Sequence, residues 1–293
     1  MLEMKNVTKT FGDFKALDDL SMTVPKGAVY GLVGPNGAGK STAIRHLTGV
    51  YRPDCGSITM DGKKIYENPA IKEKIGYIPD EVFYFSGATL EEMAKFYQGI
   101  YHSFDRELFE RLHEVFQLPQ KTPIRRMSKG MQKQAAFHLT ISCRPEVMIL
   151  DEPVDGLDPV MRRQVMSLIL SDVAERGTTV LISSHNLREL EDVCDHVGIM
   201  DHGRMLLEKS LADMQGATHK LQLVGEIPEG LEILHESGSG RLKTLIIRGT
   251  EEEITAKVAP GNPAYFDVLP LSLEEIFIYE LGGVNYAVKE ILL

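Results

Sequence analysis

Short apolar runs along the chain predict a set of buried strands. Four of them are four to six residues long and free of charged side chains: Ala28–Val33, Ile75–Ile78, Val147–Leu150 and Thr179–Ile182. Runs without polar alternation are typical of strands covered on both faces, as in the parallel sheets of α/β proteins. We therefore expect an α/β core built around these strands.

Helical spacing follows the first run and returns in residues 88–146. The apolar residues after the first run recur every three or four positions, at Ala43, Ile44, Leu47 and Val50, with Gly49 near the expected helix end. In the later segment a second apolar face is formed by Leu108, Leu112, Val115 and Phe116, and it closes at Pro119. Residues 88–146 are therefore expected to be a mainly helical subdomain.

Residues 1–84 have the pattern of strands and turns, and residues 216–293 that of a separate α+β accessory domain. Asp61-Gly62 lies between Ile58–Met60 and Lys63–Ile65, which predicts a hairpin turn. In the second region two strands and one helix are expected, at Lys220–Val224, Thr244–Arg248 and Leu273–Leu281. From Gly216 onward, six Lys or Arg stand against twelve Asp or Glu, a net charge of −6 that also indicates a domain boundary after residue 215.

The composition is that of a soluble globular protein. The 293 residues are 43% hydrophobic and 25% charged, and no apolar run approaches the roughly 18–20 residues that span a bilayer. The first residues lack the pattern of a signal peptide, and the three cysteines are expected to be reduced thiols, so a cytoplasmic location is predicted. The net charge of −10 argues against nucleic acid as a partner.

A glycine-rich loop predicts phosphate binding between the first strand and its helix. It reads Gly-x4-Gly-Lys-Ser, and its residues are Gly34, Pro35, Asn36, Gly37, Ala38, Gly39, Lys40, Ser41 and Thr42. Glycines let successive backbone N–H groups point into one concavity, and the N-terminus of the following helix adds positive charge. Lys40 can reach the β- and γ-phosphates, and the Ser41 hydroxyl can ligate Mg²⁺. The loop predicts a nucleotide site.

Two further strand ends carry side chains suited to phosphate chemistry. Asp151 and Glu152 follow the run Val147–Leu150, where Asp151 can hold Mg²⁺ and Glu152 can polarise the attacking water. His185 follows the run at Thr179–Ile182 and can face a γ-phosphate, although a lone histidine is more often a structural group than a catalytic one. The carboxyl ends of parallel strands are where such folds bind ligands.

With these residues in place, residues 1–215 resemble an ATP-binding cassette (ABC) transporter ATPase. The resemblance adds a family signature at Met127–Gln132, a D-loop at Asp155–Asp158, a switch histidine at His185 and an adenine-stacking aromatic at Phe11. It implies a P-loop NTPase cassette with a RecA-like core, an antiparallel β subdomain and a helical signature subdomain. It also implies ATP and Mg²⁺ as ligands and Lys40, Glu152 and His185 as catalytic residues.

The family resemblance implies that the site is shared between two subunits. Each ATP would lie between the loop at residues 34–42 of one cassette and Ser128, Gly130 and the D-loop residue Asp158 of a second. A helix N-terminus after the signature suits an anion, while a serine in this position is by itself expected to cap the helix. Both roles can coexist.

Two features depart from the family pattern, one at Asp80 and one in the signature. Asp80 stands where the family usually has Gln, and we expect it near the metal, with altered metal affinity or coupling. The signature carries Lys129 and Met131, a form similar to that of ABC-2-type exporters, including those of the Ytr and acetoin-utilisation group. The predicted function is thus the ATPase subunit of an exporter, working with a membrane permease and peripheral to the inner face of the membrane.

Other functions stay open at this stage. They are the ATPase of an importer, a soluble ABC protein of translation, and a regulatory module without turnover. For the permease we expect a contact at three consecutive aromatic residues, Phe83, Tyr84 and Phe85, which cannot all face one core. A mixed cluster of core and loop residues is the alternative for the same three.

Overall fold

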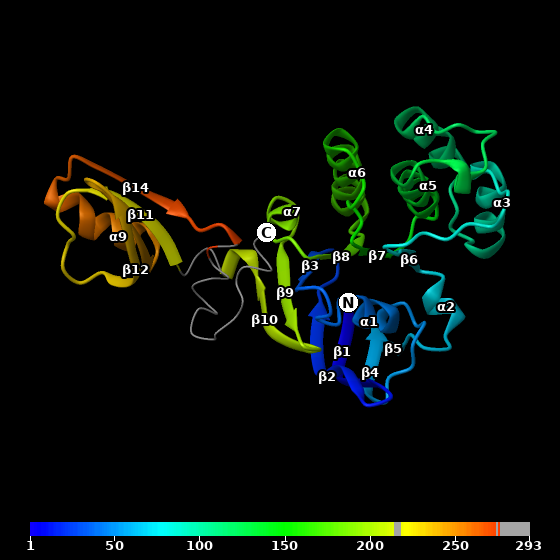
Figure 1. The fold of residues 1–293 in the computed structure, drawn as a ribbon, viewed down its shortest axis with the longest axis horizontal. Coiled ribbons are helices and arrows are strands. Elements are labelled where there is room, and N and C mark those ends of the chain that lie inside the picture. Colours follow the sequence, from blue (N-terminus) through cyan, green and yellow to red (C-terminus); the bar gives the residue numbers. More distant parts are fainter. Residues whose placement is uncertain (214–217, 274, 276–293) are drawn as a thin grey trace. The chain divides into compact units, whose positions relative to one another are not determined.

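The computed structural model describes residues 1–213, 218–273 and 275, which fall into two compact units. The first unit comprises Met1–His185 and His196–Glu208, and the second comprises Asn186–Asp195 and the residues from Lys209 onward (Figure 1). The predicted boundary between residues 215 and 216 lies in the segment 214–217, outside the described residues, so it stays a prediction.

A six-stranded sheet forms the centre of the first unit. Its order is β10-β9-β3-β8-β7-β6, with β3 at Val29–Val33, β6 at Ile75–Ile78, β7 at Val147–Asp151, β8 at Thr179–Ser184, β9 at His196–Asp201 and β10 at Arg204–Ser210. The neighbours from β9 to β6 are parallel, and every residue of β3, β7 and β8 is buried. All four predicted strands are confirmed, and they lie in one sheet.

A second, antiparallel sheet packs on the first through a shared core. Its order is β2-β1-β4-β5, with β1 at Leu2–Phe11, β2 at Phe14–Val24, β4 at Cys55–Met60 and β5 at Lys63–Lys64. The predicted turn joins β4 to β5, and the positive φ of both Asp61 (49°) and Gly62 (76°) is the conformation a two-residue hairpin needs. Side chains of both sheets and of helix α1 (Lys40–Leu47) form one apolar cluster.

Three more helices follow strands of these two sheets. α2 spans Pro69–Lys72 and α6 spans Pro159–Arg176 in the first unit, and α7 spans Arg188–Glu191 in the second.

α1 ends at Leu47, earlier than the sequence pattern indicates, because Thr48 caps it and Gly49 turns the chain with φ of 68°. The expectation that Val50 belongs to the apolar helix face is wrong, since Val50 lies beyond the helix and is 57% exposed.

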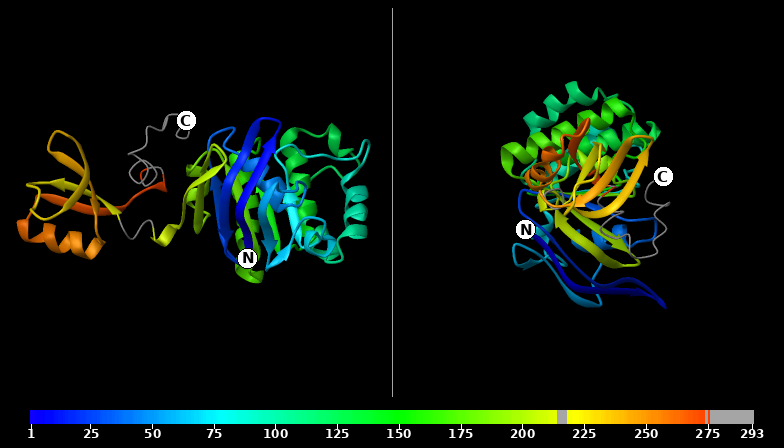
Figure 2. Two further views of the ribbon diagram at one scale, coloured as in Figure 1. Left: turned by 90° about the horizontal axis from the view of Figure 1, so that it is seen from below. Right: turned by 90° about the vertical axis from the view of Figure 1, so that its left-hand side faces the viewer.

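The predicted helical subdomain is confirmed as three helices, which we call the helical arm. They are α3 at Leu90–Ile100, α4 at Arg106–Phe116 and α5 at Lys129–Ser142, with a 3-10 turn η1 at Ile124–Arg126 before α5. The arm lies next to β6, at the opposite side of the first unit from β10 (Figures 1 and 2). The buried face of α4 is Phe109, Leu112 and Phe116, so Leu108 and Val115 are only half-buried at its flanks.

The three consecutive aromatic residues divide between core and surface. Tyr84 is buried, and its hydroxyl donates a 2.6 Å hydrogen bond to the carbonyl oxygen of Gln132 in α5. Phe83 and Phe85 are 77% and 47% exposed. The expectation that Tyr84 faces a partner is therefore wrong, because its phenol anchors the loop to the helical arm.

The second unit contains a four-stranded antiparallel sheet in the order β12-β13-β11-β14. The strands are β11 at Thr218–Val224, β12 at Glu232–Ser239, β13 at Leu242–Arg248 and β14 at Tyr265–Pro270, with α9 at Glu251–Val258 and a 3-10 turn η2 at Ala259–Gly261. Alternate residues of β11 and β13 form an apolar core with Ile254 and Val258 of α9. Both predicted strands are confirmed; most of the helix expected at Leu273–Leu281 lies outside the described residues.

No helix within the described residues is long and apolar enough to cross a bilayer.

A buried histidine makes the helical arm sensitive to acid. His138 of α5 is fully buried against the rings of Phe109 and Phe116, and its Nε2 lies 2.7 Å from the carbonyl oxygen of Phe109. Burial is the main reason why the pKa of His138 falls to about 4, and neighbouring His113 adds to the effect. His138 is therefore neutral in the folded protein at pH 5, whereas an unfolded histidine is largely protonated.

We expect His138→Gln to weaken the dependence of stability on pH. The folded-state pKa lies below the unfolded one, so this contribution is complete above about pH 6.5 and is lost as the pH falls toward 4. Between pH 7 and pH 5 the wild type should lose about 2 kcal/mol more free energy of unfolding than the variant, measured in urea. His202→Gln, at a histidine whose side chain is 92% exposed, is the control. Equal losses in wild type and His138→Gln would contradict the assignment.

Candidate nucleotide-binding site

The glycine-rich loop connects the end of β3 to the start of α1, as predicted. Two of its glycines are required by close contacts. A Cβ on Gly34 would lie 2.3 Å from the carbonyl oxygen of Met200, and one on Gly39 would lie 2.8 Å from that of Ala16. Gly39 also has φ of 103°, which L side chains rarely adopt. The loop is thus held tightly against β9 and β2, with its free face available to a ligand.

Lys40 is a buried cation at the centre of this loop. Its side chain is 6% exposed, and its Nζ donates a 2.6 Å hydrogen bond to the carbonyl oxygen of Gly34. The same nitrogen lies 3.4 Å from Oε1 of Glu152, which comes from the end of β7. A buried ammonium group needs such partners, and those present here leave it beside a cavity where phosphate oxygens can bind.

The cavity in front of the loop, which we call the phosphate pocket, has a volume of about 280 Å³. It is lined by all loop residues from Pro35 to Thr42 together with Phe14, Ala16, Asp80 and Glu152. Phe14 and Ala16 were not anticipated from the sequence. They reach the pocket because a tight turn, at which Phe11 pairs with Phe14, leads the chain from β1 into β2 beside the loop. Only this pairing of the two strands reveals their position, since no sequence motif marks them.

The predicted base-stacking residue Phe11 lies outside the residues that line the phosphate pocket. Its ring packs edge-on against Tyr51, with ring centroids 5.5 Å apart, and the side chain is 44% exposed. Its neighbour across the turn, Phe14, is 65% exposed and does line the pocket. One accessible aromatic ring, that of Phe14, therefore lines the phosphate pocket, and base stacking by Phe11 stays a prediction.

Asp151 is buried at the end of β7 and is held by two hydroxyl groups. Ser183 of β8 donates a 2.7 Å hydrogen bond to its Oδ1, and the Ser41 hydroxyl lies 3.3 Å from the same oxygen. A carboxylate beside a serine hydroxyl is a set of oxygen ligands that Mg²⁺ prefers. Burial, together with the negative charge of Asp151, raises the pKa of Tyr77 on the adjacent strand β6 to about 12, so its phenol stays neutral.

Glu152 has a backbone conformation that aims its carboxylate into the phosphate pocket. Its φ is +45°, which is uncommon for a residue with a side chain, and its N–H donates to the Ser183 hydroxyl at 3.0 Å. Oε1 faces Lys40, while Oε2 lies 3.0 Å from Nδ1 of His185. Of the three groups predicted to be catalytic, Glu152 therefore contacts both of the others, Lys40 and His185.

His185 and Asp155 border the exposed side of Glu152. The three side chains each bring one ligand atom to within 4.8 Å of the others, close enough to share a cation or an ordered water. His185 is 44% exposed, so it can respond to what binds in front of it. The interpretation of His185 as a site residue rather than a structural one is consistent with this position.

The predicted signature residues lie at the start of α5. Ser128 caps α5, its Oγ accepting a 3.3 Å hydrogen bond from the N–H of Met131, so the predicted capping role is confirmed. Gly130 is packed against the D-loop, where a Cβ would lie 2.8 Å from the carbonyl oxygen of Gly156. In the described part of the chain, neither Ser128 nor Gly130 lines the phosphate pocket.

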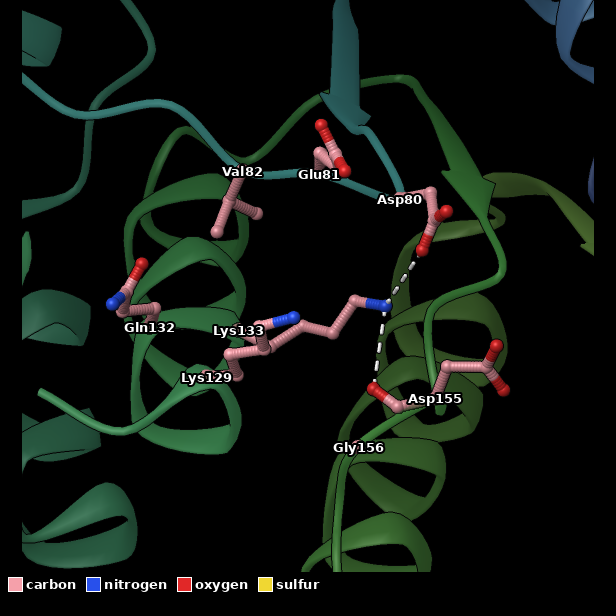
Figure 3. Close-up of a pocket in the computed structure, with 8 residues that line it drawn as sticks. All are labelled: Asp80, Glu81, Val82, Lys129, Gln132, Lys133, Asp155 and Gly156. Atoms are coloured by element: carbon pink, nitrogen blue, oxygen red, sulfur yellow. Dashed lines mark hydrogen bonds and ion pairs between the residues drawn. The ribbon is translucent and has the colours of Figure 1, made fainter.

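Asp158 and Asp80 have partners within the chain. Asp158 caps α6 through 3.0 Å hydrogen bonds from the N–H groups of Val160 and Met161. Asp80 follows β6 and lines both the phosphate pocket and a second cavity between β6 and α5. Its Oδ1 lies 3.6 Å from Nζ of Lys133 (Figure 3), a lysine that sequence reasoning did not single out.

The residues present fit a nucleoside triphosphate with a divalent cation. At Gly34 and Gly39 the loop packs tightly against β9 and β2, so its other side is free to accept phosphate groups. Lys40 supplies the positive charge that balances the negative phosphates. The hydroxyl of Ser41 and the carboxylate of Asp151 would hold Mg²⁺, and Glu152, which lines the same pocket, can accept a proton.

Comparisons with known proteins agree with this geometry. The sequence profile described as ABC transporter matches residues 17–155. Over 288 residues the chain is 31% identical to the ABC transporter ATP-binding protein YtrB of Bacillus subtilis, covering 97% of this chain and 99% of that protein. It is also 34% identical over 211 residues to the bacitracin transport ATP-binding protein BcrA of Bacillus licheniformis, covering 71% and 69% of the two chains.

Solved structures share the fold. An ATP-binding subunit of an ABC transporter superposes with a TM-score of 0.68 at 28% identity, covering 73% of this chain and 92% of that one. A dimeric bacterial ABC transporter cassette superposes with a TM-score of 0.65 at 22% identity, covering 72% and 99%. The fold is that of a P-loop cassette, and with a relative similar over almost the full length, this chain belongs to the family of ABC transporter ATP-binding proteins.

Proposed function

We propose that this protein binds ATP with Mg²⁺, dimerises on it, and hydrolyses it to drive export through a separate membrane subunit. The observation that carries the proposal is the contact of Glu152 with both Lys40 (3.4 Å) and His185 (3.0 Å) beside the buried Asp151. This arrangement joins phosphate binding, cation binding and a proton acceptor in one pocket.

In this mechanism the chain positions the phosphates and activates one water. The loop amides and Lys40 stabilise the negative charge of the β- and γ-phosphates. When bound at Ser41 and Asp151, Mg²⁺ supplies further positive charge to the phosphates. Glu152 takes a proton from the water whose oxygen attacks the γ-phosphorus, while the bond to the β-phosphate oxygen breaks. His185 holds Oε2 of Glu152 and responds to loss of the γ-phosphate.

A second subunit would complete the site. Ser128 and Gly130 lie on the N-terminal end of α5, away from the phosphate pocket of their own chain. A helix N-terminus favours an anion, so this end is suited to the γ-phosphate of a nucleotide held by another copy or a related cassette. Asp158, at the N-terminus of α6 in the adjoining D-loop, would be part of the same contact.

An exposed aromatic patch supports a membrane subunit as partner. The patch consists of Phe83 and Phe85, after β6, with Phe96 and Ile100 of α3, all at least 44% exposed. Phe85 packs edge-on between Phe83 and Phe96, with ring centroids 6.5 Å and 4.9 Å away. Adjoining apolar side chains of this size on a surface are typical of an interaction site. We infer that a cytoplasmic segment of the permease covers them, which places the protein at the inner face of the membrane.

Export is favoured over import by the relatives. The names of BcrA and of a probable multidrug ABC transporter ATP-binding protein, YbhF of Escherichia coli, describe transport of bacitracin and of drugs. The chain is 30% identical to YbhF over 221 residues, although it covers 38% of that protein. We extend the direction of transport to this chain as part of the proposal, with the substrate selected by the membrane subunit.

Glu152→Gln should separate nucleotide binding from turnover. Glutamine preserves the shape of the side chain but cannot accept the proton, so we expect phosphate release to fall about 100-fold or more while ATP binding persists. Size-exclusion chromatography with ATP and Mg²⁺ should show a stable dimer of the variant. Lys40→Ala should instead abolish binding, because it removes the buried cation of the loop.

The matched control is Glu146→Gln, at the opposite end of the same strand. Glu146 precedes β7 and its side chain is 51% exposed in a surface ion pair with Lys74, so its loss should leave turnover within about twofold. An unchanged turnover rate in Glu152→Gln would refute the role of Glu152 as the proton acceptor.

Serine substitutions in the aromatic patch should uncouple the two subunits. The double variant Phe83→Ser and Phe85→Ser is expected to keep the ATPase rate of the isolated protein, since both rings are exposed. Co-purification with the membrane subunit should fall at least about tenfold. Val50→Ser, at another exposed apolar residue, is the control. Undiminished co-purification of the double variant would rule out this patch as the docking site.

A further inference from the structure

A second buried lysine lies beside the catalytic glutamate, and the proposed mechanism has so far given it no role. Lys133 of α5 has a side chain that is 6% exposed. Its Nζ donates a 2.6 Å hydrogen bond to the carbonyl oxygen of Glu152 and lies 3.4 Å from that of Asp155. Asp80 Oδ1 is 3.6 Å from the same nitrogen, and Figure 3 shows the ammonium reaching between Asp80 and the D-loop.

These three oxygens belong to three different parts of the site. The carbonyl of Glu152 follows β7, that of Asp155 belongs to the D-loop, and the carboxylate of Asp80 follows β6. A buried ammonium group has three N–H donors, and leaving them unpaired away from water is strongly unfavourable. Because all three oxygens surround one buried ammonium group, Lys133 holds the ends of β6 and β7 and the D-loop close to one another.

The contact with Glu152 acts at a strained point of the backbone. Glu152 has φ of +45°, and this conformation turns its carboxylate toward Lys40 and His185. A left-handed conformation is unfavourable for a residue with a side chain and persists when surrounding contacts hold it. The hydrogen bond from Lys133 to the carbonyl of Glu152 is a contact of that kind.

We propose that Lys133 is a positioning residue that sets the orientation of Glu152 according to the place of Asp80 and the helical arm. Lys133 extends from α5, which begins in the signature segment, and Asp80 lies on the loop that leads to the aromatic patch. A shift of α5 or of Asp80 moves the ammonium group of Lys133. Because this group is hydrogen-bonded to the carbonyl oxygen of Glu152, the main chain that orients the Glu152 carboxylate moves with it. The inference rests on the proposed role of Glu152. It adds that Lys133 couples the orientation of Glu152 to the position of the helical arm.

The first test compares Lys133→Met with Lys133→Arg. Methionine fills a similar volume without the charge, so we expect kcat for ATP to fall at least about tenfold while KM and nucleotide affinity stay within about threefold. Arginine retains donors and should restore a measurable part of kcat. A loss of kcat accompanied by an equal loss of nucleotide affinity would indicate general damage to the site and would overturn the proposal.

The matched control for charge removal is Lys74→Met. Lys74 forms an exposed ion pair with Glu146, 2.7 Å apart, at the opposite ends of the same two strands that carry Asp80 and Glu152. It should leave kcat within about twofold. If Lys133→Met behaves like Lys74→Met, Lys133 has no positioning role.

The second test asks whether Asp80 acts through Lys133. Asp80→Asn should lower kcat in the wild type, whereas in the Lys133→Met background it should change kcat by less than about twofold. If the two substitutions lower kcat independently, so that their fold-losses multiply in the double variant, Asp80 has a separate effect, such as one on the metal. That result would overturn the proposed action of Asp80 through Lys133.

A third measurement does not depend on turnover. Hydrogen exchange of the amides from Glu152 to Leu157, without nucleotide, should be at least about tenfold faster in Lys133→Met than in the wild type or Lys74→Met. Faster exchange with an inactive wild type would leave Lys133 as the anchor of this segment while refuting the proposed ATPase. Unchanged exchange would overturn the positioning role even if the wild type hydrolyses ATP.

Discussion

The parallel order of the central sheet is the constraint on which the site depends. β3, β6, β7 and β8 run in one direction, so their carboxyl ends meet at one edge. The glycine-rich loop, Asp80, the pair Asp151 and Glu152, and His185 each follow one of those ends. A single geometric rule therefore brings together groups that are more than one hundred residues apart in the chain.

Charge balance at this edge depends on two buried lysines. Lys40 holds a carbonyl of the loop and the carboxylate of Glu152, and Lys133 holds the main chain of the same glutamate from the other side. Each ammonium group is kept from water and must use the oxygens around it. Glu152 thus lies between two cations, one contacting its side chain and the other its backbone.

The sequence predicted the core elements well because their signals are local. Apolar runs gave the four strands, the Asp61-Gly62 pair gave a hairpin, and helical spacing located the arm. Sequence-based prediction failed where contacts with other parts of the chain decide whether a side chain is buried or exposed. Val50 matched the helical period but follows a glycine with positive φ, and Tyr84 looks like its neighbours in sequence yet finds a hydrogen-bond acceptor in α5. Phe14 and Lys133 carried no motif, so only their positions reveal them.

By itself, the sequence determined the type and order of the groups that we predict to bind phosphate and to accept a proton: the glycine-rich loop, Asp151, Glu152 and His185. The tertiary structure alone decided how they are oriented: Glu152 between Lys40 and His185, Asp80 toward Lys133, and Ser128 away from the phosphate pocket of its own chain. The physical reason is that residue type sets chemistry locally, whereas the pairing of buried charges depends on which strand ends and helices the fold brings within a few ångströms.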